Sequence, residues 1–337
     1  MRFFALTFRG LEQIAAAEIA DLADTTVEQI AYRRVGGSTA DPRSLLTLRC
    51  ADDVFLLAAE WQGIIRPRSS LALMTQLSQQ LDLAPVRNQI AQWRKMPKQP
   101  LFSVTASFVG KRNYSVDEIK QAVAHGITDR THWSYTADDA SADLNIRVFI
   151  EHDTALIGVR VGKLPLHDRP YREQSQAGML KAPVAAAMVR LAQVQKGDLV
   201  VDPCCGSGTI LLELESLYLD AYALGGDLVI QNYNLPFAQW DVRRLPLPDH
   251  SVNCLISNLP WGEQVSVAAP LDRFYHELCS EIARVVAPAG RIVLLTSTPE
   301  LITLPNYLLE QQIEISLFGQ TPTIMGFASK LNLHKTS

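Results

Sequence analysis

The chain has 337 residues, which corresponds to about two domains of ordinary size. Its composition, 47% apolar and 20% charged with 18 Gly and 18 Pro, excludes a collagen-like, a disordered and a small disulfide-rich protein. The net charge of −4 divides unevenly, because residues 1–163 carry 19 basic and 18 acidic side chains (+1) and residues 164–337 carry 12 and 17 (−5). We therefore expect an anionic partner to meet local basic clusters of the first half.

The cysteines indicate the redox environment. The chain has five of them, Cys50, Cys204, Cys205, Cys254 and Cys279, without any C-x-x-C spacing. We expect reduced thiols, no disulfide framework and no metal site. The first residues lack the pattern of a signal peptide, and no apolar run approaches the roughly 20 residues of a membrane span. The sequence thus predicts a cytoplasmic protein without a membrane partner, and we expect a monomer.

Short strands and helices are predicted to alternate in the first 61 residues. The expected elements are a strand at 2–8, a helix at 11–22, a strand at 26–35, a loop at 36–42, an alternating stretch at 45–49 and a buried helix at 54–61. Such alternation predicts a small α+β sandwich of the ferredoxin-like type. We assign residues 1–60 to this N-terminal domain.

Residues 61–163 form a second predicted domain. Its expected elements are a helical segment at 64–90, a basic turn-rich patch at 92–100, a strand at 102–108, a helix at 117–130 and a hairpin of strands at 143–151 and 154–161. Ser115 and Glu118 have the spacing of a capping box at the start of the second helix. Residues 164–180 are polar without periodicity, and we interpret them as a linker.

From residue 181 the pattern changes to apolar strands that alternate with helices. Helices are expected at 183–194 and 209–217, and strands at 199–201, 222–224, 254–256 and 291–296. This alternation predicts a mostly parallel sheet with helices on both faces, in a domain that spans residues 181–337.

A glycine-rich turn follows the first of these strands, in the sequence VVDPCCGSGTILLELE at 200–215. The strand ends at Asp202, Gly206 and Gly208 form the turn, and a helix begins near Thr209. Small residues let a ligand approach the backbone, and the helix N-terminus offers N–H groups. The pattern matches neither G-x-G-x-x-G nor a phosphate-binding loop, and a cationic ligand that carries a carboxylate, S-adenosylmethionine, suits it better. The alternative is an ordinary strand–turn–helix corner.

A second turn, S-N-L-P-W-G at 257–262, follows the strand at 254–256. Ligands of parallel sheets bind beyond the carboxyl ends of the strands, so Asn258 is expected to face the same crevice as Asp202. The turn resembles the N/D-P-P-aromatic signature of class I methyltransferases that act on amino groups. The Asn258 oxygen and a backbone carbonyl near Leu259 would accept hydrogen bonds from a conjugated amine, and Trp261 would stack on the base. The alternative is a buried Pro-Trp turn.

Two acids between these turns are candidates for further cofactor contacts. Asp227 ends the predicted second strand, where an acid can bind ribose hydroxyls, and Asp241 could accept a hydrogen bond from an adenine amine. The alternative for each is a solvated loop acid.

With these residues in view, nearly the whole chain resembles the THUMP-domain class I tRNA (guanine-N2-)-methyltransferases. ALTFRGLEQIAAAEI resembles their N-terminal domain, FSVTASFVGKRNYSVDEIKQAV their THUMP domain, and FGQTPTIMGFASK their closing hairpin. DPCCGSGT and SNLPWG occur in the family's order. The resemblance implies a Rossmann-like catalytic domain with a seven-stranded sheet, S-adenosylmethionine as cofactor, and methyl transfer to the N2 amine of a guanosine in tRNA, in the acceptor stem (position 6 type).

The resemblance also implies roles for individual residues. The predicted catalytic residues are Asn258, Leu259, Pro260 and Trp261. The predicted cofactor-binding residues are Asp202, Pro203, Cys204, Gly206, Ser207, Gly208, Thr209, Asp227, Asp241, Val242 and Asn258. A basic cluster is the candidate for phosphate contacts, and its members are Arg66, Arg68, Arg94, Lys95, Lys98, Lys111 and Arg112. The alternative for this cluster is a solvated face.

One departure from the family concerns residues 228–236. Nine residues are too few for a crossover with its helix, which takes about 10–12, so this helix is expected to be missing or reduced. Val229 also stands where the family has a second acid. Two alternatives therefore remain, a tRNA-binding protein with impaired or lost methyltransferase activity and an amino methyltransferase that acts on another substrate.

Overall fold

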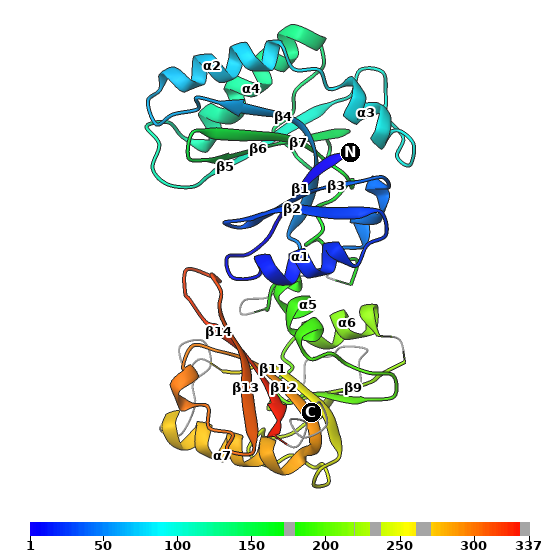
Figure 1. Ribbon diagram of the computed structural model, residues 1–337, viewed down its shortest axis with the longest axis vertical. Helices are drawn as coiled ribbons and strands as arrows, with labels where there is room; N and C mark the ends of the chain where they lie inside the picture. Colours follow the sequence, from blue (N-terminus) through cyan, green and yellow to red (C-terminus); the bar gives the residue numbers. More distant parts are fainter. Residues whose placement is uncertain (172–178, 219, 230–236, 261–270, 331–337) are drawn as a thin grey trace. The chain divides into compact units, whose positions relative to one another are not determined.

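The computed structural model describes residues 1–171, 179–218, 220–229, 237–260 and 271–330 (Figure 1). These residues divide into two compact units. The first contains Met1–Thr7 and Ala15–Asp168, and the second contains Phe8–Ile14 and the chain from Arg169. Each unit has its own seven-stranded sheet.

The first six elements form the expected ferredoxin-like arrangement. They are β1 (Arg2–Leu6), α1 (Glu12–Ala20), β2 (Thr25–Ala31), β3 (Arg34–Thr39), the 3-10 helix η1 (Pro42–Thr47) and β4 (Asp53–Gln62). The strands lie in the order β4-β1-β3-β2, and all neighbours are antiparallel. A short 3-10 helix takes the place of the second helix of this topology.

Three predictions in this region are wrong. Residues 26–35, expected as one strand, lie mostly in two, β2 and β3, and the expected loop at 36–42 is a strand as far as residue 39, because Gly36 and Gly37 pair with β1 and β2. Residues 54–61, expected as a helix, belong to strand β4, and the alternating stretch 45–49 lies mostly in η1. The run VFLLAAEW does not alternate because β4 lies inside the sheet and buries side chains on both faces, and apolar periodicity cannot separate such a strand from a buried helix. At η1, Pro42 stands in the first turn, and the Asp41 carboxylate accepts a hydrogen bond from the Arg43 N–H.

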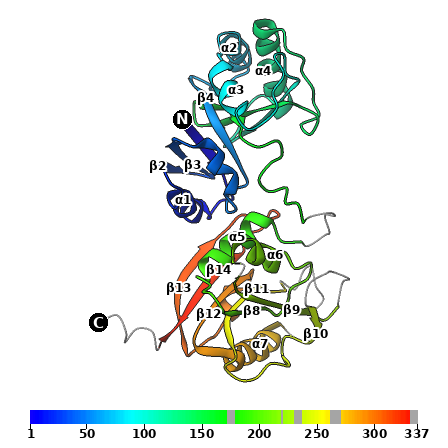
Figure 2. The same ribbon diagram turned by 90° about the vertical axis from the view of Figure 1, so that its right-hand side faces the viewer.

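The second half of this unit extends the same sheet. Its elements are α2 (Ser69–Gln79), α3 (Ala84–Ile90), β5 (Phe102–Phe108), α4 (Val116–Thr131), β6 (Leu144–Glu151) and β7 (Thr154–Arg160). Strand β7 pairs with β4, which gives one seven-stranded sheet of order β2-β3-β1-β4-β7-β6-β5. Helix α2 packs against α4 (Figures 1 and 2). The separation of 1–60 from 61–163 as domains stays a proposal, since their strands share this sheet.

The predicted capping box and hairpin are confirmed. The Ser115 hydroxyl accepts from the Glu118 N–H at 3.2 Å, and the Glu118 carboxylate accepts from the Ser115 N–H at 2.8 Å. Strands β6 and β7 pair as an antiparallel hairpin around His152-Asp153. The segment 64–90, expected as helical, contains two separate helices, α2 and α3.

The second unit contains the mostly parallel sheet. Its elements are α5 (Ala182–Leu191), β8 (Leu199–Asp202), α6 (Thr209–Leu217), β9 (Tyr222–Asp227), β10 (Phe237–Gln239), β11 (Val252–Asn258), α7 (Leu271–Val285), β12 (Val286–Thr296), η2 (Pro299–Leu301), β13 (Tyr307–Glu314) and β14 (Thr323–Ser329). The order is β10-β9-β8-β11-β12-β14-β13, and β14 alone among these strands runs opposite to the other six. The expected seven-stranded architecture is confirmed.

Helices cover both faces of this sheet, with α5 and α6 on one side and α7 on the other (Figure 2). Central residues such as Val201, Leu255 and Ile256 are fully buried, which explains their continuous apolar runs. The helix between the second and third parallel strands was expected to be missing or reduced in residues 228–236. Residues 228–229 are not helical, and residues 230–236 lie outside the described part of the chain.

The cysteines and the helices of the described residues bear on two further expectations. All five cysteines lie in the described part of the chain, and each is a thiol rather than half of a disulfide. Among the described helices, none combines the length and the apolar character needed to cross a lipid bilayer.

Candidate active site

The turn between β8 and α6 depends on two glycines with positive φ. Gly206 has φ 47° and Gly208, the residue before α6, has φ 75°. Side chains rarely adopt this conformation, so glycine allows the chain to turn directly from the strand into the helix. The first N–H groups of α6 have no partner within the helix and point out of its N-terminus beside this turn. The turn can therefore hold an anionic group such as a carboxylate.

Asp202 joins this turn to the neighbouring strand. Its carboxylate is 1% exposed and accepts from the Ser257 hydroxyl at 2.7 Å and from the Cys204 N–H at 3.3 Å. Burial raises the pKa of Asp202 to about 7, against the lowering effect of these two hydrogen bonds. A cation placed beside this carboxyl would favour its charged form, so the residue fits a ligand that carries an ammonium group.

Asn258 ends β11, next to β8 in the sheet. Its Oδ1 atom is buried, and no donor from the described residues reaches it. A buried acceptor without a donor costs about 1–3 kcal/mol, so this atom is a candidate acceptor for a donor from a ligand. The residues after Asn258 are held in place: the Leu259 N–H donates to the Leu295 carbonyl at 2.9 Å, and the Tyr275 hydroxyl donates to the Pro260 carbonyl at 3.1 Å. Trp261 lies outside the described residues.

The two candidate acids differ in their contacts. Asp227 ends β9, and its Oδ2 accepts from the Gly206 N–H at 2.9 Å, so it directly contacts the glycine turn. Asp241 follows β10, and both of its oxygens accept from the Arg243 guanidinium, at 2.6 Å for Oδ2 and Nη2 and at 3.0 Å for Oδ1 and Nε. Val242 is buried in the core of the unit. An adenine amine would therefore share the Asp241 acceptors with Arg243, and both roles stay predictions.

Four residues that support this site were not predicted. Ser257 bonds Asp202, Tyr275 bonds Pro260, the Thr296 hydroxyl lies 2.9 Å from that of Tyr275, and the Trp240 Nε1 donates to the Pro203 carbonyl at 3.0 Å. Ser257 belongs to the recognised S-N-L-P-W-G turn, which was a usable signal. For Tyr275 and Thr296, no local pattern indicates that their hydroxyls meet at this turn.

The two adjacent cysteines do not favour nucleophilic catalysis. Burial raises the pKa of Cys204 well above its usual value, and burial together with Asp202 also raises that of Cys205. Both are therefore thiols at neutral pH, whereas a cysteine nucleophile needs a lowered pKa.

The predicted basic cluster divides into two groups in the first unit. Arg94, Lys95 and Lys98 precede β5, whereas Lys111 and Arg112 follow it. The seven residues of β5 span roughly 20 Å, at about 3.3 Å per residue, so the cluster is not one patch.

Several of these arginines have structural partners. The Arg94 guanidinium donates to the carbonyls of Gly162 and Asp143, and Arg112 donates to those of Ile64 and His152. Arg66 and Arg68 both bond Asn113, and Arg68 also pairs with Glu118. Lys95, Lys98 and Lys111 are exposed, and they are the better candidates for phosphate contacts.

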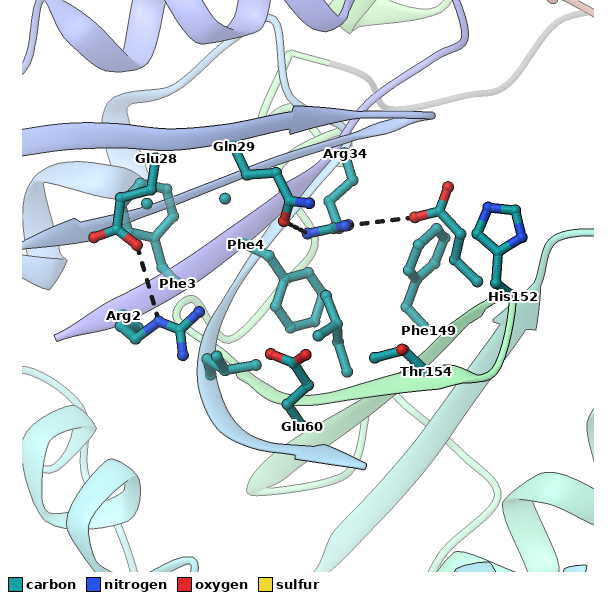
Figure 3. Close-up of a pocket in the computed structure, with 15 residues that line it drawn as sticks. Arg2, Phe3, Phe4, Glu28, Gln29, Arg34, Glu60, Phe149, His152 and Thr154 are labelled. Carbon is teal, nitrogen blue, oxygen red and sulfur yellow. Dashed lines mark hydrogen bonds and ion pairs between the residues drawn. The ribbon is translucent and has the colours of Figure 1, made fainter. Parts of the chain in front are cut away.

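A hollow of about 230 Å³ lies in the first unit, over β1–β4, β6 and β7 (Figure 3). The Arg34 guanidinium lies across it, with Nη1 3.0 Å from Gln29 Oε1 and Nη2 3.4 Å from Glu151 Oε2. Phe4 and Phe149 also line it. None of the predicted cofactor or RNA residues is among its lining residues. The described residues contain no group of His, Cys, Asp and Glu side chains suited to hold a metal ion.

The second unit defines the class of this protein. A seven-stranded sheet with one antiparallel strand, a glycine turn after β8 and Asn258 at the end of β11 are the features of the class I methyltransferase fold. Residues 169–223 and 231–314 match the model of the RMKL-like methyltransferase domain, and residues 88–160 match the model of the THUMP domain. The chain thus combines a THUMP domain with an RMKL-like methyltransferase domain, which confirms the resemblance expected from the motifs.

Individual relatives agree with this assignment. The chain is 31% identical to a U6 snRNA (guanine-N(2))-methyltransferase of Bos taurus over 186 residues, which are 51% of this chain and 36% of the relative. It is 27% identical to a tRNA (guanine(6)-N2)-methyltransferase of Thermus thermophilus over 226 residues, which are 62% of this chain and 66% of the relative. The chain therefore matches less than two thirds of the length of either relative. The crystal structure of TrmN from Thermus thermophilus has the same fold, with TM-score 0.77, 23% identity and 97% of this chain and 99% of that chain covered.

Proposed function

We propose that this protein transfers a methyl group from S-adenosylmethionine to the N2 amine of a guanosine in tRNA. The observation that carries the proposal is the buried Asn258 Oδ1 without a donor among the described residues, at a strand end that the Ser257–Asp202 hydrogen bond joins to the glycine turn. S-adenosylmethionine, when bound, supplies a methyl group activated by a sulfonium.

The residues of this chain divide the binding of the cofactor between them. The N–H groups at the start of α6 would donate hydrogen bonds to its carboxylate, and the buried Asp202 carboxylate would favour its ammonium group. Asp227, at the end of β9 and bonded to the Gly206 N–H, would accept hydrogen bonds from the ribose hydroxyls. The raised pKa of Asp202 fits this role, because a bound ammonium would restore the carboxylate charge.

Asn258 and the backbone after it hold the amine. The N2 lone pair of guanine is delocalised into the ring, which makes the amine a poor nucleophile. Asn258 Oδ1 and the Leu259 carbonyl accept hydrogen bonds from its two N–H groups, which favours a pyramidal nitrogen and stabilises its developing positive charge. The remaining contribution to catalysis is the positioning of the amine against the methyl group, which can lower the reaction barrier by roughly 7–11 kcal/mol.

The first unit supports an RNA substrate. It contains the THUMP domain, and the exposed Lys95, Lys98 and Lys111 offer phosphate contacts. The relatives named above act on guanine N2 of tRNA or of U6 snRNA. We propose tRNA with its acceptor stem as target, where a paired guanine must be flipped out to reach Asn258. A monomeric, cytoplasmic enzyme completes the proposal.

The test is nucleoside mass spectrometry of tRNA incubated with the protein and S-adenosylmethionine. We expect N2-methylguanosine with the wild-type protein and at least a 100-fold lower rate with Asn258→Ala, whose affinity for tRNA stays unchanged. Asn253→Ala is the matched control, because Asn253 lies at the other end of β11 and its Oδ1 accepts from the Leu199 N–H at 2.8 Å. If Asn258→Ala lost its affinity for tRNA together with its activity, this would contradict the proposed role of Asn258 in holding the amine.

Parallel reactions separate the alternative functions. Isothermal titration with S-adenosylmethionine should show binding, and its absence would favour a tRNA-binding protein that no longer catalyses. Methyl transfer to U6 snRNA, DNA or protein in place of tRNA would identify an amino methyltransferase with a different substrate.

A further inference from the structure

The connection between β13 and β14 lies at the same edge of the sheet as the candidate active site. Glu314, the last residue of β13, pairs with Thr323, and Thr323 pairs with Thr296 at the end of β12. Strand β12 is parallel to β11, where Asn258 lies opposite Leu295. Residues 315–322 therefore leave the sheet where β11 and β8 end, and they extend beyond it as a hairpin (Figure 1).

The tip of this hairpin is a two-residue turn with an unfavourable residue. Leu317 and Gln320 exchange both backbone hydrogen bonds at 3.0 Å, and the residues between them have φ 53° at Phe318 and φ 80° at Gly319. Two positive φ values define a type I′ turn, which favours Asn-Gly. A bulky side chain is disfavoured in this conformation, so Phe318 makes the turn less stable than Asn would.

Packing does not compensate for this cost. Phe318 is 50% exposed, whereas its neighbour Leu317 is buried and anchors the hairpin. The ring contacts Lys181, whose Nζ lies 5.3 Å from the ring centroid. Lys181 is the residue before α5, and no carboxylate of the described residues pairs with it. An exposed aromatic ring and an ammonium group without a carboxylate partner among the described residues thus lie side by side, at the edge of the sheet where the candidate active site lies.

We propose that Phe318 and Lys181 together form an RNA contact of the catalytic unit. The exposed ring stacks on a nucleobase of the substrate, since every base offers a π-face, and the ammonium pairs with a phosphate beside it. Strain retained at an exposed position is typical of a functional residue. The inference rests on the proposed function, because it assumes that RNA approaches this edge.

Phe318→Asn is the decisive variant, because it relieves the turn and removes the ring. We expect its Tm to equal or exceed that of the wild-type protein, while its affinity for tRNA, measured by fluorescence anisotropy, falls about 5- to 100-fold. Phe318→Trp should retain most of the affinity. Tyr222→Asn is the matched control, since Tyr222 is 69% exposed but begins β9 at the opposite edge of the sheet, and we expect it to bind tRNA like the wild-type protein.

The salt dependence separates the two side chains. Lys181→Gln should reduce the slope of log affinity against log salt by about 1, and Phe318→Asn should leave that slope unchanged. Wild-type tRNA affinity in Phe318→Asn would overturn the inference, as would an equal loss of S-adenosylmethionine affinity, which would indicate a structural role. Failure of the wild-type protein to bind tRNA or to methylate it would instead contradict the proposed function.

Discussion

At the scale of single residues, Tyr275 connects the buried core of the second unit to the candidate active site. It is fully buried on α7, and its hydroxyl lies within hydrogen-bond distance of the Pro260 carbonyl and of Thr296 Oγ1, at 3.1 and 2.9 Å. Because the proposed function assigns the Leu259 carbonyl to the reacting amine, holding the Pro260 carbonyl also helps to fix the Leu259–Pro260 peptide before it. We therefore regard Tyr275 as a positioning residue.

Tyr275→Phe tests this role. The variant leaves the Pro260 carbonyl without its donor, so we expect the free energy of unfolding to fall by about 1–3 kcal/mol. The kcat of methyl transfer should fall by about 10-fold or more, while the affinity for S-adenosylmethionine stays unchanged. Tyr307→Phe is the control, because among the described residues the partner of the buried Tyr307 hydroxyl is the Val286 carbonyl, at 3.4 Å and away from the candidate site. Equal kcat in both variants would leave Tyr275 with a purely structural role.

At the scale of elements, the wall of the candidate cofactor site depends on how closely β9 and the residues after β10 pack. The Trp240 indole lies against the backbone of Gly226, where a Cβ atom would come within 2.1 Å of Trp240 Cε2. The same indole donates to the Pro203 carbonyl in the glycine turn. This packing holds Asp227, the next residue of β9, beside Gly206.

Gly226→Ala should therefore displace Trp240. We expect a loss of about 1–3 kcal/mol in the free energy of unfolding, and weaker binding of S-adenosylmethionine in isothermal titration. Gly326→Ala is the matched control in β14, where the nearest atom to a new Cβ, Gln311 Cβ, lies at an ordinary 3.5 Å. If Gly226→Ala bound the cofactor as tightly as the control, the indole would not support the site.

At the scale of the whole molecule, the proposed RNA contacts lie in both units. The exposed lysines of the first unit stand at the two ends of β5, and Phe318 and Lys181 belong to the second unit. Because the net charge of the chain is negative, these local groups must supply the attraction for phosphate. Each lysine that contacts a phosphate adds about 1 to the slope of log affinity against log salt concentration.

Replacing Lys95 and Lys98 by Gln measures the contribution of one end of β5. We expect weaker tRNA binding and a salt slope reduced by up to about 2, and Lys111→Gln should reduce it by about 1. Lys120→Gln is the control, since the Lys120 ammonium lies 3.0 Å from Asp117 Oδ1 within α4. An unchanged slope in a variant would remove that end of β5 from the RNA interface.

The sequence by itself was sufficient wherever the interactions are local. The capping box at Ser115 and the strand–turn–helix around Gly206 and Gly208 each depend on residues a few positions apart, so they could be predicted from spacing. The apolar runs of the parallel sheet also predicted the architecture, because strands buried on both faces are continuous in sequence.

The tertiary structure decided the features that join distant residues. The hydrogen bond between Asp202 and Ser257 spans 55 positions, and the predicted RNA contact Arg94 also has a structural role, because it donates to the carbonyls of Gly162 and Asp143, 68 and 49 positions away. The assignment of 54–61 to β4 likewise depends on its pairing with β1 and β7. Local patterns do not specify such pairs, because the order of strands in a sheet is set by packing between segments far apart in the chain.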